Sequence, residues 1–135
     1  MINKNIVLRL SNEIGNQMFM YAAAFSIAKK MNRNLFIDDE TAFLLKKNIS
    51  SYGLNHFKIT APIINNNLKF KNMKGYLKRK LLIKTDFIRK QKKFFIENKD
   101  KNKITSFNLD ILLKNFSDNF YLEGHFESEK YFNDI

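Results

Sequence analysis

The residues best suited to bind a ligand lie where a short apolar strand would meet a helix, at Gly15-Asn16-Gln17. At such a junction the first backbone N–H groups of the helix lack partners and the helix dipole favours electron-rich atoms. The amides of Asn16 and Gln17 both donate and accept hydrogen bonds. This chemistry is typical of a site for a sugar or a nucleotide sugar. The simpler interpretation is a helix cap, with Asn12 or Asn16 satisfying the N–H groups.

Acidic and imidazole side chains give weaker signals. Asp38, Asp39 and Glu40 are adjacent carboxylates, as a metal site or a general base would require. Neighbouring side chains on a strand point to opposite faces, so a solvated strand end is the simpler interpretation. His125 suits either acid–base chemistry or structural packing. We identify no catalytic residue and predict no metal site and no cofactor.

A strand–helix–strand unit must position the first motif. Residues 6–10 and 35–37 are apolar and rich in branched side chains, which predicts buried strands. Between them, the apolar spacing over about 16–31 predicts a helix. This order favours a right-handed βαβ crossover in a parallel sheet, and hence an α/β fold. Further elements are expected at 57–59 (short strand), 110–116 (helix), 120–122 (strand) and from about 128 (helix).

Composition indicates one domain over residues 1–135. Hydrophobic residues make up 44% of the chain, enough for a core. There is no cysteine, so disulfides and thiolate metal sites are excluded. We see neither a signal peptide nor an apolar run long enough to span a membrane. The expected location is therefore cytoplasmic, or peripheral at the inner face of the membrane.

Positive charge is concentrated in residues 69–103. This segment holds 14 of the 24 Lys and Arg but 3 of the 13 Asp and Glu, which accounts for the whole net charge of +11. Apolar clusters alternate with basic residues over 73–96, which predicts one or two basic amphipathic helices. A solvated helical face is the default interpretation, and contact with an anionic membrane is the next. Nucleic-acid binding is not expected, because no recognised motif accompanies the charge.

Two blocks of the sequence resemble a known family. Residues 14–22 read Ile-Gly-Asn-Gln-Met-Phe-x-Tyr-Ala after a strand ending Arg-Leu. This resembles the amino-terminal signature of bacterial α-1,2-fucosyltransferases (glycosyltransferase family 11), usually Gly-Gly-Leu-Gly-Asn-Gln-Met-Phe-Gln-Tyr. Residues 121–132, Tyr-Leu-Glu-Gly-His-Phe-Glu-Ser-Glu-Lys-Tyr-Phe, are similar to the family's Tyr-Leu-Asp-Gly-Tyr-Trp-Gln-Ser-Glu-Lys-Tyr-Phe. The blocks have the family's order and separation.

The resemblance implies both a fold and an activity. It implies the first of two Rossmann-like domains of a GT-B-like enzyme, with a cleft between the domains. The implied reaction transfers fucose from GDP-fucose to a galactose 2-hydroxyl of a cell-surface glycan, with inversion and without an obligatory metal. The nucleotide sugar and the glycan acceptor would be its partners. Substrate contacts would come from Gly15, Asn16, Gln17, Gly124 and His125, the last at an aromatic position of the family.

Two departures from the family pattern modify this expectation. Asn12 and Glu13 stand where the family has two glycines, and the Glu13 carboxylate would repel a pyrophosphate. The family's donor-binding motif, His-x-Arg-Arg-x-Asp, does not occur in the chain. We therefore expect an amino-terminal half that is inactive alone. Two alternatives stay open: a small basic nucleic-acid-binding protein, and a non-catalytic glycan-binding fragment.

Overall fold

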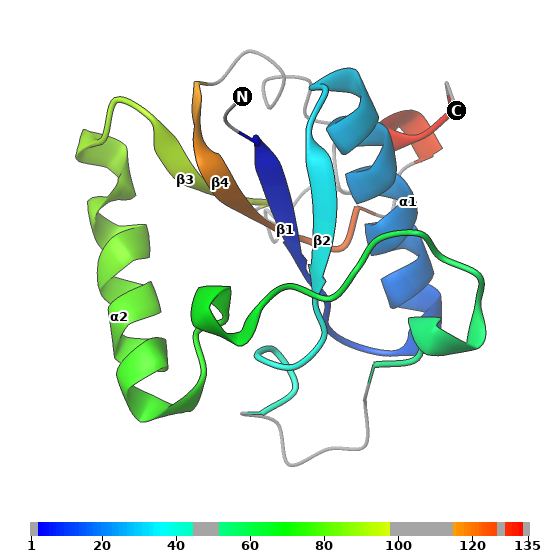
Figure 1. Ribbon diagram of the computed structural model, residues 1–135, viewed down its shortest axis with the longest axis horizontal. Coiled ribbons are helices and arrows are strands. Elements are labelled where there is room, and N and C mark those ends of the chain that lie inside the picture. The colour runs from blue at the N-terminus through cyan, green and yellow to red at the C-terminus, as the bar shows by residue number, and fades with distance from the viewer. Residues whose placement is uncertain (1–2, 45–51, 98–114, 127–128, 134–135) are drawn as a thin grey trace, which may run out of the picture.

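Four parallel strands form the sheet of the described residues, in the order β2-β1-β4-β3 (Figure 1). The computed structural model describes residues 3–44, 52–97, 115–126 and 129–133. The strands are β1 (Asn5–Arg9), β2 (Asn34–Asp38), β3 (Lys92–Ile96) and β4 (Phe116–Glu123), and the helices are α1 (Ile14–Lys30) and α2 (Asn72–Thr85). The predicted α/β class with a parallel, Rossmann-like sheet is confirmed.

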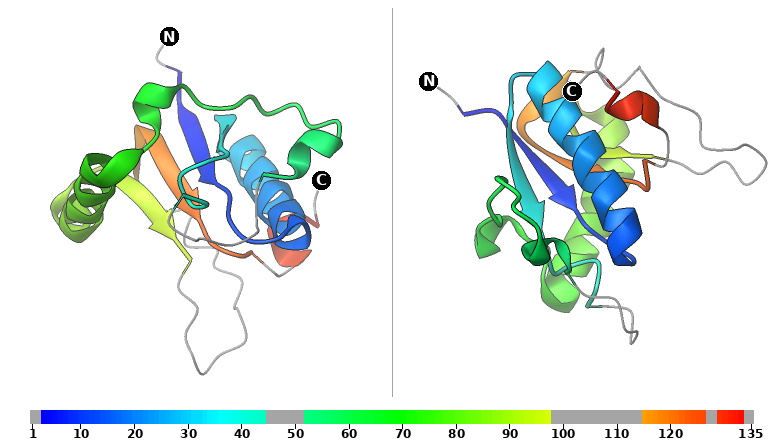
Figure 2. Two further views of the ribbon diagram at one scale, coloured as in Figure 1. Left: turned by 90° about the horizontal axis from the view of Figure 1, so that it is seen from below. Right: turned by 90° about the vertical axis from the view of Figure 1, so that its right-hand side faces the viewer.

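The two helices lie on opposite faces of the sheet (Figures 1 and 2). Helix α1 packs on the face that carries Ile6, Leu8 and Leu122, and these three side chains are fully buried. Alanines on α1 allow the helix to approach this face closely, and they belong to the same core cluster. Side chains alternate along a strand, so Arg9 and Glu123 project from the opposite face, toward α2.

Strand β1 lies at the centre, between β2 and β4. An asparagine ladder joins the first residues of β1 and β2 to the middle of β4. The Asn5 amide donates to Asn119 Oδ1 at 2.7 Å, and the Asn34 amide donates to Asn5 Oδ1 at 3.2 Å. Because all strands run parallel, their carboxyl ends meet at the opposite edge of the sheet. The first and last parts of the described chain are therefore neighbours there.

The helical prediction over residues 73–96 is only partly correct. Helix α2 ends at Thr85, and Phe94 and Phe95 lie in β3. The Asp86 carboxylate fixes the turn between them, because it accepts the backbone N–H of Lys93 at 2.9 Å and that of Phe94 at 3.3 Å. Both phenylalanines are buried, as expected for aromatic residues in a strand. Of the basic segment 69–103, residues 98–103 lie outside the described residues.

Other predicted elements differ from the structure. Residues 57–59 form no strand; a short 3₁₀ helix, Leu54–His56, precedes them, and Ile63 instead forms a parallel bridge with Ile37. Glu129–Tyr131 is a 3₁₀ turn, and residue 128 lies outside the described residues. Residues 110–114 of the predicted helix also lie outside them, while Phe116 begins β4. Neither helix of the described chain is long and apolar enough to cross a membrane.

Candidate functional site

A polar pocket opens where the carboxyl ends of β1, β3 and β4 meet. We call it the carboxyl-edge pocket. It has a volume of about 210 Å³ and is lined by residues that include Ser11, Glu97, Glu123, Gly124 and His125. Open α/β sheets bind ligands in the crevice outside the carboxyl ends of their strands. The pocket lies at that edge, where β1 has β2 on one side and β4 on the other.

Met20 of the first block quoted above and Gly124 and His125 of the second line this pocket together, and Asn12 lies just before the first block. The Asn12 amide nitrogen lies 3.2 Å from Nδ1 of His125, although the residues are 113 positions apart. Asn12 has a left-handed backbone with φ of 64°, a conformation that asparagine tolerates better than most residues. His125 is half-buried, and its neighbour Phe126 provides the aromatic packing, edge-on to Tyr131.

Gly15 and Asn16 lie in the first turn of α1, outside the set of residues that lines the pocket. Gly15 is exposed, and a Cβ atom built there would meet nothing within 4 Å. The N-cap residue, Glu13, makes no side-chain capping hydrogen bond. The first-turn N–H groups therefore face outward at the same edge of the sheet, and an exposed carboxylate stands beside them.

Gln17 is placed differently from a ligand contact. Its side chain is completely buried. The amide nitrogen donates to the Asn12 carbonyl at 2.8 Å, and the amide oxygen accepts the Gly53 N–H at 2.9 Å. In this structure Gln17 therefore fastens the strand-to-helix turn to the 3₁₀ segment that follows Gly53. Any influence of Gln17 on a ligand would act through the shape of that turn.

Gly124 has a steric reason to be glycine. Its φ is 149°, and an added Cβ would lie 2.5 Å from Cβ of Glu97. The Glu97 carboxylate accepts the N–H of Phe126 at 3.0 Å and the hydroxyl of Tyr131 at 2.6 Å. Gly124 thus lets β4 end close to β3, and Glu97 holds the chain as it turns away from the pocket. The pocket wall is rigidly positioned at this corner.

An ion-pair network beneath the pocket was not predicted from the sequence. The Glu123 carboxylate pairs with Arg79 of α2 and lies 3.4 Å from the Arg9 guanidinium. Burial lowers the pKa of Arg9, and the opposing charge of Glu123 raises it in part. One signal for this network was available. Arg9 and Glu123 are charged residues at the ends of apolar strands, where a charge needs a partner.

The carboxylates that follow β2 are not a solvated strand end. Asp38 is buried, accepts the N–H groups of Glu40 and Thr41, and pairs with the Thr41 hydroxyl. The buried Lys69 ammonium lies 2.8 Å from carboxylate oxygens of both Asp39 and Glu40. The prediction of free carboxylates here is therefore wrong, because a lysine 30 positions from Asp39 covers them.

These pairs shift two pKa values. Burial alone would lower the pKa of Lys69, but its hydrogen bonds to Asp39 and Glu40 outweigh that effect and raise it. Hydrogen bonds from Lys69 and Lys71 lower the pKa of Glu40. The local charges are thus mutually neutralised. In the part of the chain that the structure describes, no three His, Cys, Asp or Glu side chains are grouped so that they could hold a metal ion.

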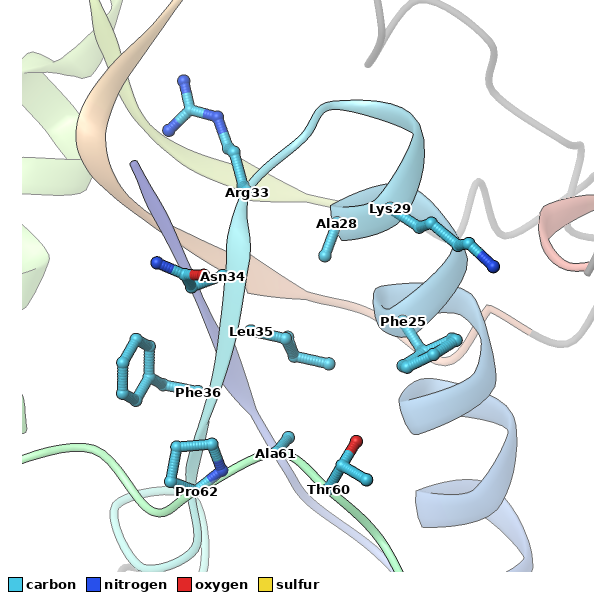
Figure 3. A pocket seen from close by; sticks show the side chains of 10 residues that line it. All are labelled: Phe25, Ala28, Lys29, Arg33, Asn34, Leu35, Phe36, Thr60, Ala61 and Pro62. Atoms are coloured by element: carbon cyan, nitrogen blue, oxygen red, sulfur yellow. The ribbon is translucent and has the colours of Figure 1, made fainter. Parts of the chain in front are cut away.

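Two larger hollows are present in the described part of the chain, and the first shares Arg9 with the carboxyl-edge pocket. One, of about 280 Å³, lies between Arg9 and the first turns of α2. The other, of about 490 Å³, lies at the amino end of β2 (Figure 3). Arg33 borders it, but its guanidinium points away from the other lining side chains and donates to carbonyl oxygens of β4. The largest of these three hollows is therefore not our candidate site, because it lies at the amino ends of the strands and open α/β sheets bind ligands at the carboxyl ends.

The carboxyl-edge pocket combines Ser11, Glu97 and His125 with a half-buried ion-pair network around Glu123. Its polar groups suit hydroxyl groups of a ligand, since carboxylates accept hydrogen bonds and amide and imidazole N–H groups donate them. Of the residues expected to contact substrate, Gly124 and His125 line this pocket. Gly15 and Asn16 lie in the first turn of α1, outside the pocket lining, and Gln17 is buried. No family model, no curated protein and no solved structure matches the chain.

Proposed function

We propose that this chain is the amino-terminal, acceptor-binding half of a GT-B-like glycosyltransferase of the α-1,2-fucosyltransferase type. One observation carries the proposal. The two sequence blocks that resemble the family meet in space at Phe19 and Phe132, whose ring centroids are 6.0 Å apart. Asn12, just before the first block, contacts His125 of the second at the carboxyl edge of a parallel sheet. The proposed reaction moves fucose from GDP-fucose to a galactose hydroxyl.

The charges around the pocket favour a neutral ligand over a pyrophosphate. Glu97 and Glu123 line it, and the exposed Glu13 stands at the start of α1. Arg9 also lines it, but Arg9 and Arg79 of α2 already share the carboxylate of Glu123. A second anion would have to compete with that carboxylate, whereas sugar hydroxyls would add hydrogen bonds. We therefore assign this pocket to the galactose of the acceptor rather than to GDP.

His125 is the group in this pocket best placed to take a proton. Inverting transfer requires removal of the proton from the attacking hydroxyl as the nucleotide leaves. The imidazole can accept that proton only on a ring nitrogen that does not already accept the Asn12 N–H. We therefore propose the tautomer in which Nδ1–H faces the side-chain oxygen of Asn12 and the lone pair of Nε2 is free for the hydroxyl proton. The leaving nucleotide needs cationic groups on the opposite side. The chain contains no His-x-Arg-Arg-x-Asp pattern to supply them, so we propose that transfer needs a second domain.

The proposal is tested by titrating the protein with a β-galactoside and with GDP, followed by NMR. We expect millimolar binding of the galactoside, with shift changes at Ser11, Gly124 and His125, and weaker binding of GDP. His125→Ala should weaken galactoside binding at least ten-fold, which is about the effect of losing one well-placed polar contact. His56→Ala is the matched control, because His56 is exposed and outside the pocket lining.

Transfer itself is tested with a carboxy-terminal half that carries the arginine motif, supplied in cis or as a separate piece. We expect fucose transfer only from the combined protein, and its loss in His125→Ala. Turnover by residues 1–135 alone would contradict the proposal. Equal galactoside affinity for the two histidine variants would remove the acceptor site from this pocket. Galactoside binding without transfer by the combined protein would favour the alternative of a non-catalytic glycan-binding protein.

A further inference from the structure

Helix α2 presents an unpartnered outer face. None of its 14 residues is buried. The side that faces the sheet is half-buried and carries Tyr76, Arg79 and Ile83, with Arg79 paired to Glu123 of β4. Figure 2 shows α2 standing at the side of the sheet away from α1. The other half of the helix surface is therefore exposed in the described part of the chain.

The outer face of α2 carries a row of large apolar side chains. Met73, Leu77 and Leu81 recur every four residues, so they lie on one side of the helix. Their exposed fractions are 70%, 58% and 63%. Phe87 and Ile88 in the 3₁₀ turn after α2 are also among the most exposed large apolar residues, at 79% and 68%. An apolar surface of this extent usually marks an interaction site.

Lysines border the apolar row on both sides. On the helix, Lys80 lies on one side of the row and Lys74 and Lys78 on the other, with Lys84 at its end; all four are exposed. There is no acidic residue anywhere in α2. The outer face is thus apolar along its centre and positive around it. That is the pattern of a helix lying in the interface of an anionic membrane.

We propose that the outer face of α2 docks on an anionic lipid surface. The helix would lie parallel to the membrane, with the apolar row inserted among the head groups and the lysines against lipid phosphates and carboxylates. At 1.5 Å per residue its 14 residues would extend about 21 Å along the surface. This proposal rests on α2 alone and does not depend on the proposed glycosyltransferase activity.

Charge and side-chain type argue against two other occupants. A second copy packed on this face by two-fold symmetry would place lysines against lysines, with no acidic residue on α2 to offset the repulsion. A nucleic acid would meet mainly aliphatic side chains, whereas single-stranded nucleic acids are bound by aromatic stacking platforms within a positive groove. A lipid surface satisfies both the apolar row and the lysines.

The test is co-sedimentation of the full chain with vesicles of phosphatidylcholine alone or mixed equally with phosphatidylserine. We expect binding only to the anionic vesicles, and much less at about 1 M salt than at about 0.1 M, since the Debye length falls from roughly 10 Å to 3 Å. Lys78→Gln with Lys84→Gln should weaken it roughly 25-fold, about five-fold for each lysine. Leu77→Ser with Leu81→Ser should weaken binding to a similar degree.

The matched control is Lys29→Gln with Lys58→Gln, which removes the same charge from exposed lysines elsewhere. We expect it to change vesicle binding less than two-fold. Equal binding to neutral vesicles, or an equal loss in the control, would overturn the proposal. So would self-association that Leu77→Ser with Leu81→Ser abolishes, which would indicate a second copy. Tighter binding to an RNA oligonucleotide than to anionic vesicles would also overturn it.

Discussion

Replacement of Gln17 by methionine separates the structural role of this residue from a ligand contact. Methionine keeps the length and approximate volume of the side chain but can neither donate nor accept a strong hydrogen bond. The change leaves the Asn12 carbonyl and the Gly53 N–H without the partners they have at 2.8 and 2.9 Å. Each loss costs about 1–3 kcal/mol for a buried group. Because Asn12 and Gly53 are themselves half-buried, water can satisfy them in part.

The expected decrease in the free energy of unfolding is therefore about 2–4 kcal/mol. At a urea m-value of about 1.5 kcal/mol/M, the unfolding midpoint should fall by roughly 1.3–2.7 M. Equilibrium urea unfolding followed by circular dichroism measures this change. Asn16→Ala is the control, since Asn16 is the neighbouring residue on α1 and its side chain is only half-buried. We expect the control to change the free energy of unfolding by less than about 1 kcal/mol.

Two results would refute this reasoning. An unchanged midpoint in Gln17→Met would show that the two hydrogen bonds do not stabilise the turn. An unchanged midpoint together with weaker galactoside binding would return Gln17 to the role of a direct ligand contact. A lower midpoint with galactoside binding retained by the folded protein is the expected combination.

Three further outcomes follow from the structure. Gly124→Ala should lower the free energy of unfolding by about 2–4 kcal/mol, because the added Cβ would crowd Glu97 at a positive φ. In the same urea assay, Gly15→Ala should change the free energy of unfolding by less than about 1 kcal/mol, because the space around Gly15 is open. Burial raises the pKa of Tyr121 to about 12. The stability gained from the protonated Tyr121 hydroxyl should therefore be complete below pH 10 and lost as the pH rises toward 12. Tyr121→Phe should reduce this alkaline loss of stability in unfolding measurements. Lys69→Met should lower the free energy of unfolding by about 1–3 kcal/mol at pH 7. The decrease should be smaller near pH 3, where the unpaired carboxylates become protonated; unfolding measured between pH 3 and pH 7 tests this.

Local sequence patterns predicted the first half of the fold well. Strand β1, helix α1 and strand β2 follow one another with short links, so apolar periodicity alone locates them within about two residues. The same reasoning failed at Phe94 and Phe95, because a short apolar run fits a helix or a strand equally well. The carboxylate of Asp86 decides the matter by binding backbone N–H groups seven and eight residues away.

The site could not be fully predicted from the sequence, because it depends on contacts between residues far apart in the chain. The order β2-β1-β4-β3 depends on contacts between residues more than 100 positions apart, which no periodicity reports. Lys69 was expected to be solvated with the rest of the basic segment, yet it is buried by pairing with Asp39 and Glu40. The resemblance identified the block that contains His125 and another block that begins just after Asn12, but only the structure shows that these two residues touch.

The central position of β1 has a consequence for how the chain folds. Its neighbour β4 pairs with it across about 114 residues, and closing a loop of that length costs roughly 4 kcal/mol of chain entropy before any contact offsets it. The local unit of β1, α1 and β2 can form earlier, which leaves one edge of β1 uncovered. During that interval the open edge could accept β4 from a second molecule as well as its own. The carboxyl-edge pocket has one wall from each end of the described chain, so it is complete only after β4 has joined β1.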